Sequence, residues 1–517
     1  MLNRNKHDGH RFRIFGCSIA AIAAGMLLSA SSAMADSPVR GGTLTIGRSA
    51  DIFTFDPYNT QDDRSIFTEL TVYERLVKLS DDGKSVVPEL ATKWDVSADG
   101  LTADFTLRDG VQFSDGSPLT ADDVVFSLTR AIDQKGSWGF LFSPVKSVTK
   151  LDDHTIRIAM SEPFAPLLPA LSTFAASIYS KANFEKQGDA AGQHPLGTAA
   201  FMVDHWDKGE SLVLKRNPHY WQSGKPYLDE VVFKVVGDDN ARVLQLASGD
   251  IDLATDVGAN QVDQITNASG KIYAVSGTAV GMVTLNEKVK PLDEASVRCA
   301  LAWAVDRESI AKVVYFGRAK PARSPLPSST LFYDPNADAV GYDLDKAKAL
   351  LAKSSVPSGF TFETQVSSGD TAAAQVAQIW AASLAKIGVN MTIKSVEATT
   401  AQDLYNTEKY AMEISGWTND TPDPDEFMGV ALDYQPQNGL HSSYHSDAAR
   451  NEVLAARKET DPAKRQKLYS DLQRIVSTEC PFIYLDEQDR LYAASPAVHD
   501  FAPNAQGKYG LENVWKQ

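Results

Sequence analysis

The sequence predicts an α/β protein with mixed sheets flanked by helices. Two observations lead to this expectation: strand-like and helix-like segments alternate in both halves of the chain, and neither an internal repeat nor a low-complexity tract interrupts them. The chain has 517 residues, which is more than one compact core usually holds, so we expect two or three domains.

Residues 1–35 are predicted to form a cleaved secretory signal peptide. A basic segment comes first, an apolar run follows at residues 14–28, and residues 33–35 form a cleavage site of the A-x-A type. Because Cys17 precedes nearly all of the apolar run, we expect a free periplasmic protein rather than a lipid-anchored one. The apolar run is too short for a membrane span, and no other run in the chain is long enough.

The chain is strongly acidic. Its formal net charge is −16, and removal of the signal peptide makes it about −19 because four bases and one acid are lost. A negative surface repels phosphate groups, which argues against nucleic acid and against an anionic membrane as partners.

Only two cysteines, Cys299 and Cys480, remain after the signal peptide. A chain of this length can build its own cores and does not need a disulfide framework. We therefore expect two structural thiols rather than a bridge.

The first half of the mature chain predicts mainly strands. Two helices have clear end signals: Thr120 and Asp123 can cap the start of one, and Gly249 can end another in a left-handed conformation. Another helix should present Ile66 and Leu70 on its buried face. The strands are expected at residues 41–46, 91–96, 103–107, 212–214, 229–236, 251–253 and 280–286, with a strand–turn–strand unit at 145–160.

The second half predicts helices and strands in alternation. The helices are expected at residues 293–305, 307–316, 344–353, 371–386, 447–460 and 462–478, and the strands at 389–396, 482–485 and 490–493.

Residues 411–427 are the strongest candidate for a binding site. A strand at residues 411–414 should leave its sheet through Ser415 and Gly416 and then present Trp417. A loop stiffened by two prolines follows, and an aromatic face beside fixed carboxylates suits a ligand with an apolar body and a cationic group. A surface turn with a half-buried tryptophan is the alternative. The acids of this loop are Asp420, Asp423, Asp425 and Glu426.

Motifs for catalysis, metals and nucleotides are missing. The sequence contains no H-E-x-x-H, no G-x-S-x-G, no Walker A motif and no spaced Cys/His cluster. His441 and His445 lie four residues apart, but in a Gly/Ser-rich segment, so we expect a solvated loop rather than a metal site. We therefore expect a binding protein without cofactor or metal. The rival interpretation is a secreted hydrolase or transferase that pairs Asp420 with Asp423 or Asp425 as acid and base.

Several motifs closely resemble family 5 extracellular solute-binding proteins, the dipeptide- and oligopeptide-type receptors of ABC importers. The likeness covers essentially the whole chain after the signal peptide. The motifs that carry it are PELATKW at residues 88–94, FTLRDGVQFSDG at 105–116, LTADDVVFS at 119–127, LKRNPHYW at 214–221, ASGDIDL at 247–253, VRCALAWAVDR at 297–307 and GW at 416–417.

The resemblance implies a two-lobed periplasmic-binding-protein fold of three domains, one of them an inserted domain. Ligand would be enclosed between the lobes by hinge closure. Domain I would comprise residues 36–78, 196–290 and 486–517, domain II residues 79–195, and domain III residues 291–485.

The resemblance also implies a ligand site. In peptide-binding relatives, the aspartate shortly after the Gly-Trp pair binds the peptide's amino group, and that position here is Asp420. Relatives that bind a dipeptide's carboxylate carry an arginine before or within the helix expected at residues 371–386. This chain has none there, so that role is vacant or is filled by Arg64 or another base. The implied ligand-binding residues are Asp420, Trp417, Gly416, Asn419, Arg64, Gln61 and Ser368.

The implied function is that of a periplasmic receptor that delivers a solute to the permease subunits of an ABC importer. A di- or oligopeptide is the expected ligand. Other members of the family bind sugars, opine-like conjugates or metal chelates, so a non-peptide solute is the alternative. We expect the receptor to act as a monomer and to bind no nucleic acid.

Overall fold

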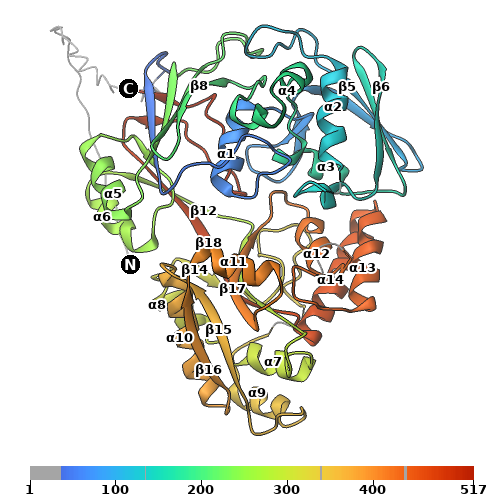
Figure 1. The fold of residues 1–517 in the computed structure, drawn as a ribbon, viewed down its shortest axis with the longest axis vertical. Helices are drawn as coiled ribbons and strands as arrows, with labels where there is room; N and C mark the ends of the chain where they lie inside the picture. The colour runs from blue at the N-terminus through green and yellow to red at the C-terminus, as the bar shows by residue number, and fades with distance from the viewer. Residues whose placement is uncertain (1–36, 134, 338–339, 436–438) are drawn as a thin grey trace, which may run out of the picture. The chain divides into compact units, whose positions relative to one another are not determined.

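The computed structural model describes residues 37–133, 135–337, 340–435 and 439–517. The expected signal peptide, with Cys17, lies outside the described residues. Val39–Gln517 forms one compact unit, in which three groups of strands and helices can be followed in Figure 1.

The first group is built around β1 (Thr43–Arg48). This strand lies between two parallel neighbours, β10 and β11, and its apolar residues Leu44 and Ile46 are fully buried. Strands β9 and β8 extend the sheet in antiparallel order. The other elements of this group are α1 (Asp63–Val72), β8 (Phe201–Asp207), β9 (Ser211–Arg216), β10 (Glu230–Val235), α5 (Asp239–Ser248), β11 (Leu253–Ala254), η4 (Ala259–Gln261), α6 (Val262–Asn267) and β12 (Lys271–Ser276).

The second group contains a separate four-stranded antiparallel sheet in the order β4-β5-β7-β6. Helix α2 begins with the predicted capping box, because Thr120 and Asp123 bond each other's backbone N–H groups. The elements of this group are β2 (Val77–Leu79), β3 (Val86–Pro88), β4 (Ala91–Val96), β5 (Thr102–Leu107), α2 (Ala121–Ala131), η1 (Gly139–Phe142), β6 (Val145–Asp152), β7 (Thr155–Met160), α3 (Leu167–Leu171), η2 (Phe174–Ala176), α4 (Lys181–Gln187) and η3 (Gly188–Gln193).

The third group surrounds the antiparallel pair β13 and β17. Helix α10 packs against it through Trp380, which is fully buried and donates from Nε1 to the carbonyl of Leu301 in α7. The elements are β13 (Ala279–Leu285), α7 (Ala295–Trp303), α8 (Arg307–Val313), β14 (Ala319–Pro321), α9 (Leu344–Leu351), β15 (Thr361–Ser367), α10 (Thr371–Ala385), β16 (Asn390–Val396), α11 (Ala398–Asn406), β17 (Met412–Thr418), α12 (Asp425–Ala431), α13 (Asp447–Lys458) and α14 (Pro462–Glu479).

One strand joins the first and third groups. β18 (Phe482–Ala494) pairs through its first half with β13 and β14 and through its second half with β11 and β12. It is the long strand that links the two sheets in Figure 1. After it, β19 (Val498–His499) and β20 (Trp515–Lys516) form a small pair near the C-terminus. The expectation of two strands, at residues 482–485 and 490–493, was therefore wrong: the polar residues between them stay in the strand because neighbouring strands pair with them.

The helices expected in the second half are confirmed, with ends within a few residues of the prediction. Gly249 ends α5 at φ 83°, in the left-handed region that favours glycine. Two expectations near the candidate site were wrong. β17 continues through Trp417 to Thr418 instead of leaving the sheet at Ser415 and Gly416, and Asp425 already begins helix α12.

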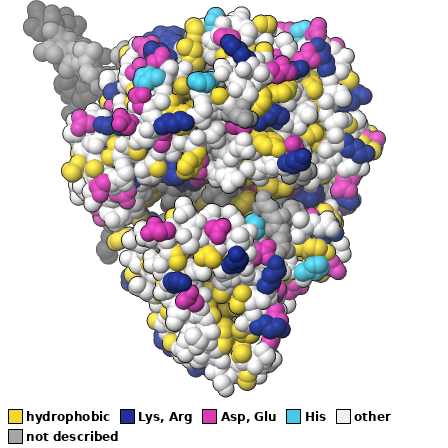
Figure 2. Space-filling view, in the orientation of Figure 1, with side chains coloured by type: hydrophobic (Ala, Val, Ile, Leu, Met, Phe, Trp, Pro, Cys, Tyr) yellow, Lys and Arg dark blue, Asp and Glu magenta, His cyan; other side chains and the backbone are white. Residues whose placement is uncertain are grey.

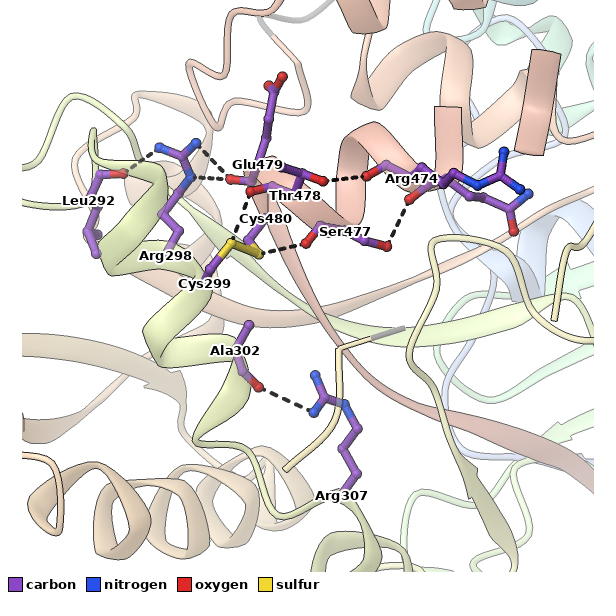
Figure 3. Close-up of a disulfide and its surroundings, with 11 residues drawn as sticks. Leu292, Arg298, Cys299, Ala302, Arg307, Arg474, Ser477, Thr478, Glu479 and Cys480 are labelled. Carbon is purple, nitrogen blue, oxygen red and sulfur yellow. Dashed lines mark hydrogen bonds between the residues drawn. A yellow bond between two sulfur atoms is a disulfide. The ribbon is translucent and has the colours of Figure 1, made fainter. Parts of the chain in front are cut away.

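The two cysteines form a disulfide, contrary to the expectation of free thiols. Cys299 lies in α7 and Cys480 at the C-terminal cap of α14, and their Cα atoms are 5.2 Å apart although 181 residues separate them. Figure 3 shows the bridge beside Arg298, which donates to the carbonyl of Glu479 at 2.9 Å. The fold brings together two helix segments that the sequence places far apart, so spacing alone could not reveal the pair.

Acidic and basic side chains are mixed on the face shown in Figure 2. Basic residues do not gather there into a stripe of the kind that binds phosphate backbones. Across the described residues, none of the helices combines the length and apolarity that a membrane crossing requires.

Candidate ligand-binding site

A cavity of about 620 Å³ lies where strands β13, β17 and β18 meet helix α1 and the start of α10. Its volume falls within the range of sites that enclose small molecules, about 300–1,000 Å³. Its lining includes Arg48, Asp63, Arg64, Phe67, Asp256, Gly281, Tyr315, Asp370, Ser415, Gly416, Trp417, Asp489, Arg490 and Tyr509.

Two glycines face each other across strands β13 and β17 in the wall of this cavity. Gly281 pairs with Gly416 in the antiparallel register. A Cβ atom on Gly281 would lie 2.7 Å from a carboxylate oxygen of Asp486, and one on Gly416 would lie 3.1 Å from the carbonyl oxygen of Val280. Only glycine fits at position 281 without a shift of its neighbours, and the pair leaves bare backbone on which a ligand can rest.

Trp417 follows directly on the same strand and also lines the cavity. Its Nε1 donates to Oδ1 of Asn419 at 3.2 Å, and its ring packs at a centroid distance of 5.8 Å from Phe427. These contacts hold the indole in place, so the cavity has a fixed aromatic wall.

Two of the three arginines in the cavity wall are neutralised by the protein. Arg48 donates to Asp51 at 2.6 Å and lies over the ring of Phe233. Arg490 forms an ion pair with Asp63, the first residue of α1. Because their charges are already paired, these two bases attract an anion less than an unpaired arginine would, and they serve mainly as part of the wall.

Arg64 has the most exposed and most loosely paired guanidinium of the three. It lies in the first turn of α1, and its side chain is 35% exposed. Its Nε is 4.0 Å from a carboxylate oxygen of Asp62, which is too far for a hydrogen bond, and among the described residues this Nε has no hydrogen-bond partner. A carboxylate in the cavity could bind this guanidinium.

Asp256 is an acid of the cavity wall whose charge interacts with that of Arg64. Burial raises the pKa of Asp256, but hydrogen bonds from the backbone N–H and hydroxyl of Ser49 and the charges of Arg64 and Arg242 outweigh it, so the pKa lies below its usual value. Asp256 therefore stays ionised, and the cavity wall carries both signs of charge.

Asp420, the residue expected to bind a ligand's cation, is bound to a cation of the protein itself. Nζ of Lys508 lies 2.8 Å from Oδ1 of Asp420 and 3.1 Å from its carbonyl oxygen. Both side chains are buried, and neither Asp420 nor Lys508 belongs to the lining of the 620 Å³ cavity.

The other acids of the loop also point into the protein. Asp423 pairs with Arg465 through two bonds of 2.5 and 2.9 Å, and Asp425 accepts from Nε of Arg457 at 3.0 Å. The carboxylate of Glu426 accepts the backbone N–H groups of residues 420 and 421. Because Asp420, Asp423 and Asp425 are each bound to a separate base, Asp420 does not pair with Asp423 or Asp425 as the acid and base of a hydrolase.

Of the seven residues expected to contact ligand, three line the cavity: Arg64, Gly416 and Trp417. Gln61 instead donates to Ser137, and the backbone N–H of Ser368 bonds to β16. The remaining two, Asn419 and Asp420, lie buried just beyond the end of β17. Sequence reasoning missed Gly281, Arg490 and Tyr509. Only Gly281 gave a signal, as an isolated glycine inside an expected strand.

The two histidines weighed as metal ligands have separate partners. His441 packs against Tyr405 and His445 stacks on Tyr434. In the ranges that the structure covers, no three His, Cys, Asp or Glu side chains are grouped so as to hold a metal ion.

The chain is similar to curated bacterial receptors over nearly all its length. It is 30% identical over 492 residues to the "probable D,D-dipeptide-binding periplasmic protein DdpA" of Escherichia coli, covering 93% of this chain and 95% of that protein. It is 29% identical over 483 residues to the glutathione-binding protein GsiB of Salmonella typhimurium, covering 91% and 94%.

Solved structures show the same fold. The DppA protein of Helicobacter pylori, in complex with the peptide STSA, matches with a TM-score of 0.84 at 29% identity and covers 92% of this chain and 98% of its own. AgaA from A. tumefaciens, in complex with agropinic acid, matches with a TM-score of 0.83 at 26% identity and covers 92% and 99%. The model of the "bacterial extracellular solute-binding proteins, family 5 Middle" matches residues 85–439. The chain therefore belongs to family 5 of the bacterial extracellular solute-binding proteins.

Proposed function

We propose that the protein captures a di- or oligopeptide in the 620 Å³ cavity and delivers it, as a periplasmic monomer, to the permease subunits of an ABC importer. As a member of family 5 it is a solute-binding receptor and not an enzyme. The peptide ligand is proposed because relatives of this chain are named for dipeptides and glutathione, and one is solved with a bound peptide.

The observation that carries the proposal is the composition of the cavity wall. A bare glycine pair, a fixed tryptophan, the loosely paired Arg64 and the ionised Asp256 surround one cavity. A peptide offers a matching set of groups: a backbone, side chains with apolar surface, and a carboxylate at one end. In this proposal Arg64 binds the carboxylate, Gly416 leaves room for the peptide backbone, and Trp417 covers an apolar side chain.

We propose for this chain the same three domains that the family resemblance implies. Residues 36–78, 196–290 and 486–517 would form domain I, residues 79–195 domain II and residues 291–485 domain III. With these boundaries the chain would cross between domains I and III twice, at residues 290–291, after β13, and at residues 485–486, within β18. Closure about these crossings should lower the radius of gyration measured by small-angle scattering when a saturating peptide is added.

Ligand binding tests the proposal directly. Protein stripped of ligand by unfolding and refolding would be screened by thermal shift against di-, tri- and tetrapeptides, with agropinic acid and a sugar set as competitors. A bound peptide should raise the melting temperature, because it stabilises the folded state alone. A rise with a non-peptide solute only would contradict the peptide assignment and leave the receptor assignment intact.

The role of Arg64 is tested by Arg64→Gln. Loss of a charge-assisted hydrogen bond to the peptide carboxylate should weaken binding by about 1.5–3 kcal/mol in calorimetry. Arg157→Gln is the matched control, because Arg157 pairs with Asp104 on the β5–β7 sheet and does not line the cavity. Equal affinity of Arg64→Gln and wild type would show that Arg64 does not bind the ligand.

A further inference from the structure

We propose that this receptor binds the cationic group of its ligand at the start of α10, on Asp370 and Tyr315 in the lining of the 620 Å³ cavity and on Asp486 just behind that lining. We call this part of the wall the α10 end and the part around Arg64 the α1 end. A peptide would then lie with its carboxylate toward α1 and its ammonium group toward α10. The inference rests on the proposed function and adds the orientation of the ligand.

The bases of the cavity lining all come from one set of elements. They are Arg48 in β1, Arg64 in α1 and Arg490 in the second half of β18. Tyr315 follows helix α8, and Asp370 is the N-terminal cap of α10. These two segments contribute no base to the lining. An anionic group is therefore attracted to the α1 end, and a cationic group to the α10 end.

Asp486 brings a buried carboxylate to the α10 end. It pairs with Gly281 in the register of β13 and β18, so its side chain projects from the same face of the sheet as the empty side-chain position of that glycine. A Cβ atom on Gly281 would lie 2.7 and 2.9 Å from the two carboxylate oxygens of Asp486. Because Gly281 itself lines the cavity, its missing side chain leaves this carboxylate directly at the cavity wall.

The carboxylate of Asp486 is fully buried but only partly hydrogen-bonded. Its Oδ1 accepts from Nε2 of Gln488 at 2.8 Å, whereas Oδ2 has no hydrogen-bond partner among the described residues. Burial raises the pKa of Asp486 to about 6, although hydrogen bonds with Gln488 and Tyr315 act against this, so the group is mainly ionised at pH 7. A buried charged oxygen without a partner is unfavourable, and a cation of the ligand beside it would supply the missing bond.

Tyr315 links this carboxylate to Asp370. Burial and, after it, the negative charges of Asp486 and Asp370 raise the pKa of Tyr315, so its hydroxyl stays protonated. Because both acids act on this one side chain, they converge on the same part of the wall. Asp370 is exposed, and its Oδ1 accepts the backbone N–H of Ala373 at 2.9 Å. A carboxylate has about four lone-pair sites, so the same group can also accept from an ammonium.

The other acids of the lining are weaker candidates. Asp63 is paired with Arg490, and Asp256 accepts two hydrogen bonds from Ser49 and interacts with the charge of Arg64. Asp489 accepts from the hydroxyl of Ser276 at 2.7 Å and remains the main rival. The class of ligand that fits is a zwitterion with a carboxylate at one end and a free ammonium group at the other. A solute whose amino end is blocked loses the contacts at the α10 end.

The experiment measures which peptides each protein retains. The probe is an equimolar mixture of di-, tri- and tetrapeptides in free, N-acetylated and C-amidated forms, added to protein stripped of ligand. Native mass spectrometry then gives the ratios of free to acetylated and of free to amidated peptide. Asp343→Asn is the matched control, because Asp343 caps α9 as Asp370 caps α10 but does not line the cavity. Asparagine caps a helix as well as aspartate does. The proteins are wild type, Asp370→Asn, Asp486→Asn, Arg64→Gln, Asp256→Asn, Asp489→Asn and Asp343→Asn.

We expect wild type to favour free over acetylated peptide by at least about tenfold, because an ammonium bound to carboxylates is lost on acetylation. Asp370→Asn and Asp486→Asn should each lower this ratio by at least about threefold and leave the ratio of free to amidated peptide unchanged. Arg64→Gln should do the reverse. Asp343→Asn should change neither ratio. If Asp486→Asn does not fold, Asp370→Asn decides alone, because its capping bond is kept.

Four results would overturn the inference. Wild type could retain free and acetylated peptide equally, or the ratio could stay unchanged in a folded Asp370→Asn or Asp486→Asn. The ratio could instead fall in Asp489→Asn or Asp256→Asn alone, which would place the ammonium group elsewhere. A fall in the ratio of free to amidated peptide in Asp370→Asn would mean that the peptide lies in the opposite direction. All of these leave the proposed function intact, whereas retention of no peptide in any form would overturn both.

Discussion

The loop at residues 420–426 and the segment at residues 59–64 are both polar and charged, but they differ in where their charges point. Every acid of the loop is bound inside the protein, by Lys508, by two arginines or by backbone N–H groups. In the segment, by contrast, Arg64 lines the cavity and has only a loose ion pair, with Asp62 at 4.0 Å. Charge density in a sequence therefore does not indicate a ligand site until the partners of each charge are known.

The partners of the loop are distant in sequence, which explains the difference. Arg457, Arg465 and Lys508 follow the acids they bind by 32, 42 and 88 residues. Arg64 has Asp62 at 4.0 Å, a distance too long for a hydrogen bond, and its charge also acts on Asp256. The following substitutions test the contrast between the paired acids of the loop and the loosely paired Arg64.

The largest effect is expected for Arg465→Leu. This change leaves the buried carboxylate of Asp423 without its partner, so the free energy of unfolding should fall by about 3–5 kcal/mol. Arg64→Leu, made in the same ligand-free protein, should change it by no more than about 0.5 kcal/mol, because no buried partner is left unpaired. Urea unfolding of both variants gives the comparison. Similar losses in the two would mean that the loop and the segment do not differ in the way described.

The disulfide supports the helix that supplies Arg465, because Cys480 caps the end of α14. Replacing both cysteines by serine should lower stability by about 2–4 kcal/mol. Thermal unfolding with and without reductant measures the effect, and the double variant, which has nothing to reduce, is the control. A thiol assay on unfolded, unreduced mature protein should find no free thiol. Two free thiols per chain would contradict the bridge.

Glu413, on the strand that leads into the loop, shows what burial does to an acid. Burial raises its pKa to about 7. An acid with a raised folded-state pKa destabilises the protein above that pKa, and stability returns as the pH falls toward the pKa of the unfolded chain, near 4.5. Glu413→Gln should therefore raise stability by about 1–2 kcal/mol at pH 8.5 and by almost nothing at pH 5. Thermal unfolding at both pH values measures the difference. Glu363→Gln, at a more exposed site on β15, should show no such pH dependence.

The smallest effect is expected for Asp104→Asn. Asp104 pairs with Arg157 on the surface of the four-stranded sheet, where the side chains are 33% and 42% exposed. Solvent weakens such a pair, so the loss should be about 0–1 kcal/mol in urea unfolding. A loss as large as that of Arg465→Leu would remove the distinction between buried and exposed pairs.

Local signals in the sequence predicted the helices well. The capping box at Thr120, the left-handed stop at Gly249 and the apolar periodicity of α13 and α14 all depend on residues within one or two turns, and all are confirmed. The polar stretch inside β18 was interpreted as a break between two strands, because the contacts that stabilise it come from distant parts of the chain. Asp486 is buried behind Gly281, and β14 pairs with this part of the strand.

The site was predictable only in part, for the same reason. Gly416, Trp417 and Arg64 carry family or local signals, and all three line the cavity. The pairing of Asp420 with Lys508 has no local signal, since the lysine lies in the C-terminal segment and meets the loop only after folding. The bridge between Cys299 and Cys480 was missed because it too depends on a contact across the folded protein.

The position of β18 has a consequence for the order in which the chain can fold. This strand supplies a central partner to both large groups of strands, yet it starts only at Phe482. A chain that emerges from its N-terminus can build local helices and hairpins early, but neither sheet acquires its shared strand until the last part of the chain is available. The fold can therefore be completed only after the last part of the chain has emerged. Until then, folding intermediates have unpaired strand edges, which must not associate with other chains.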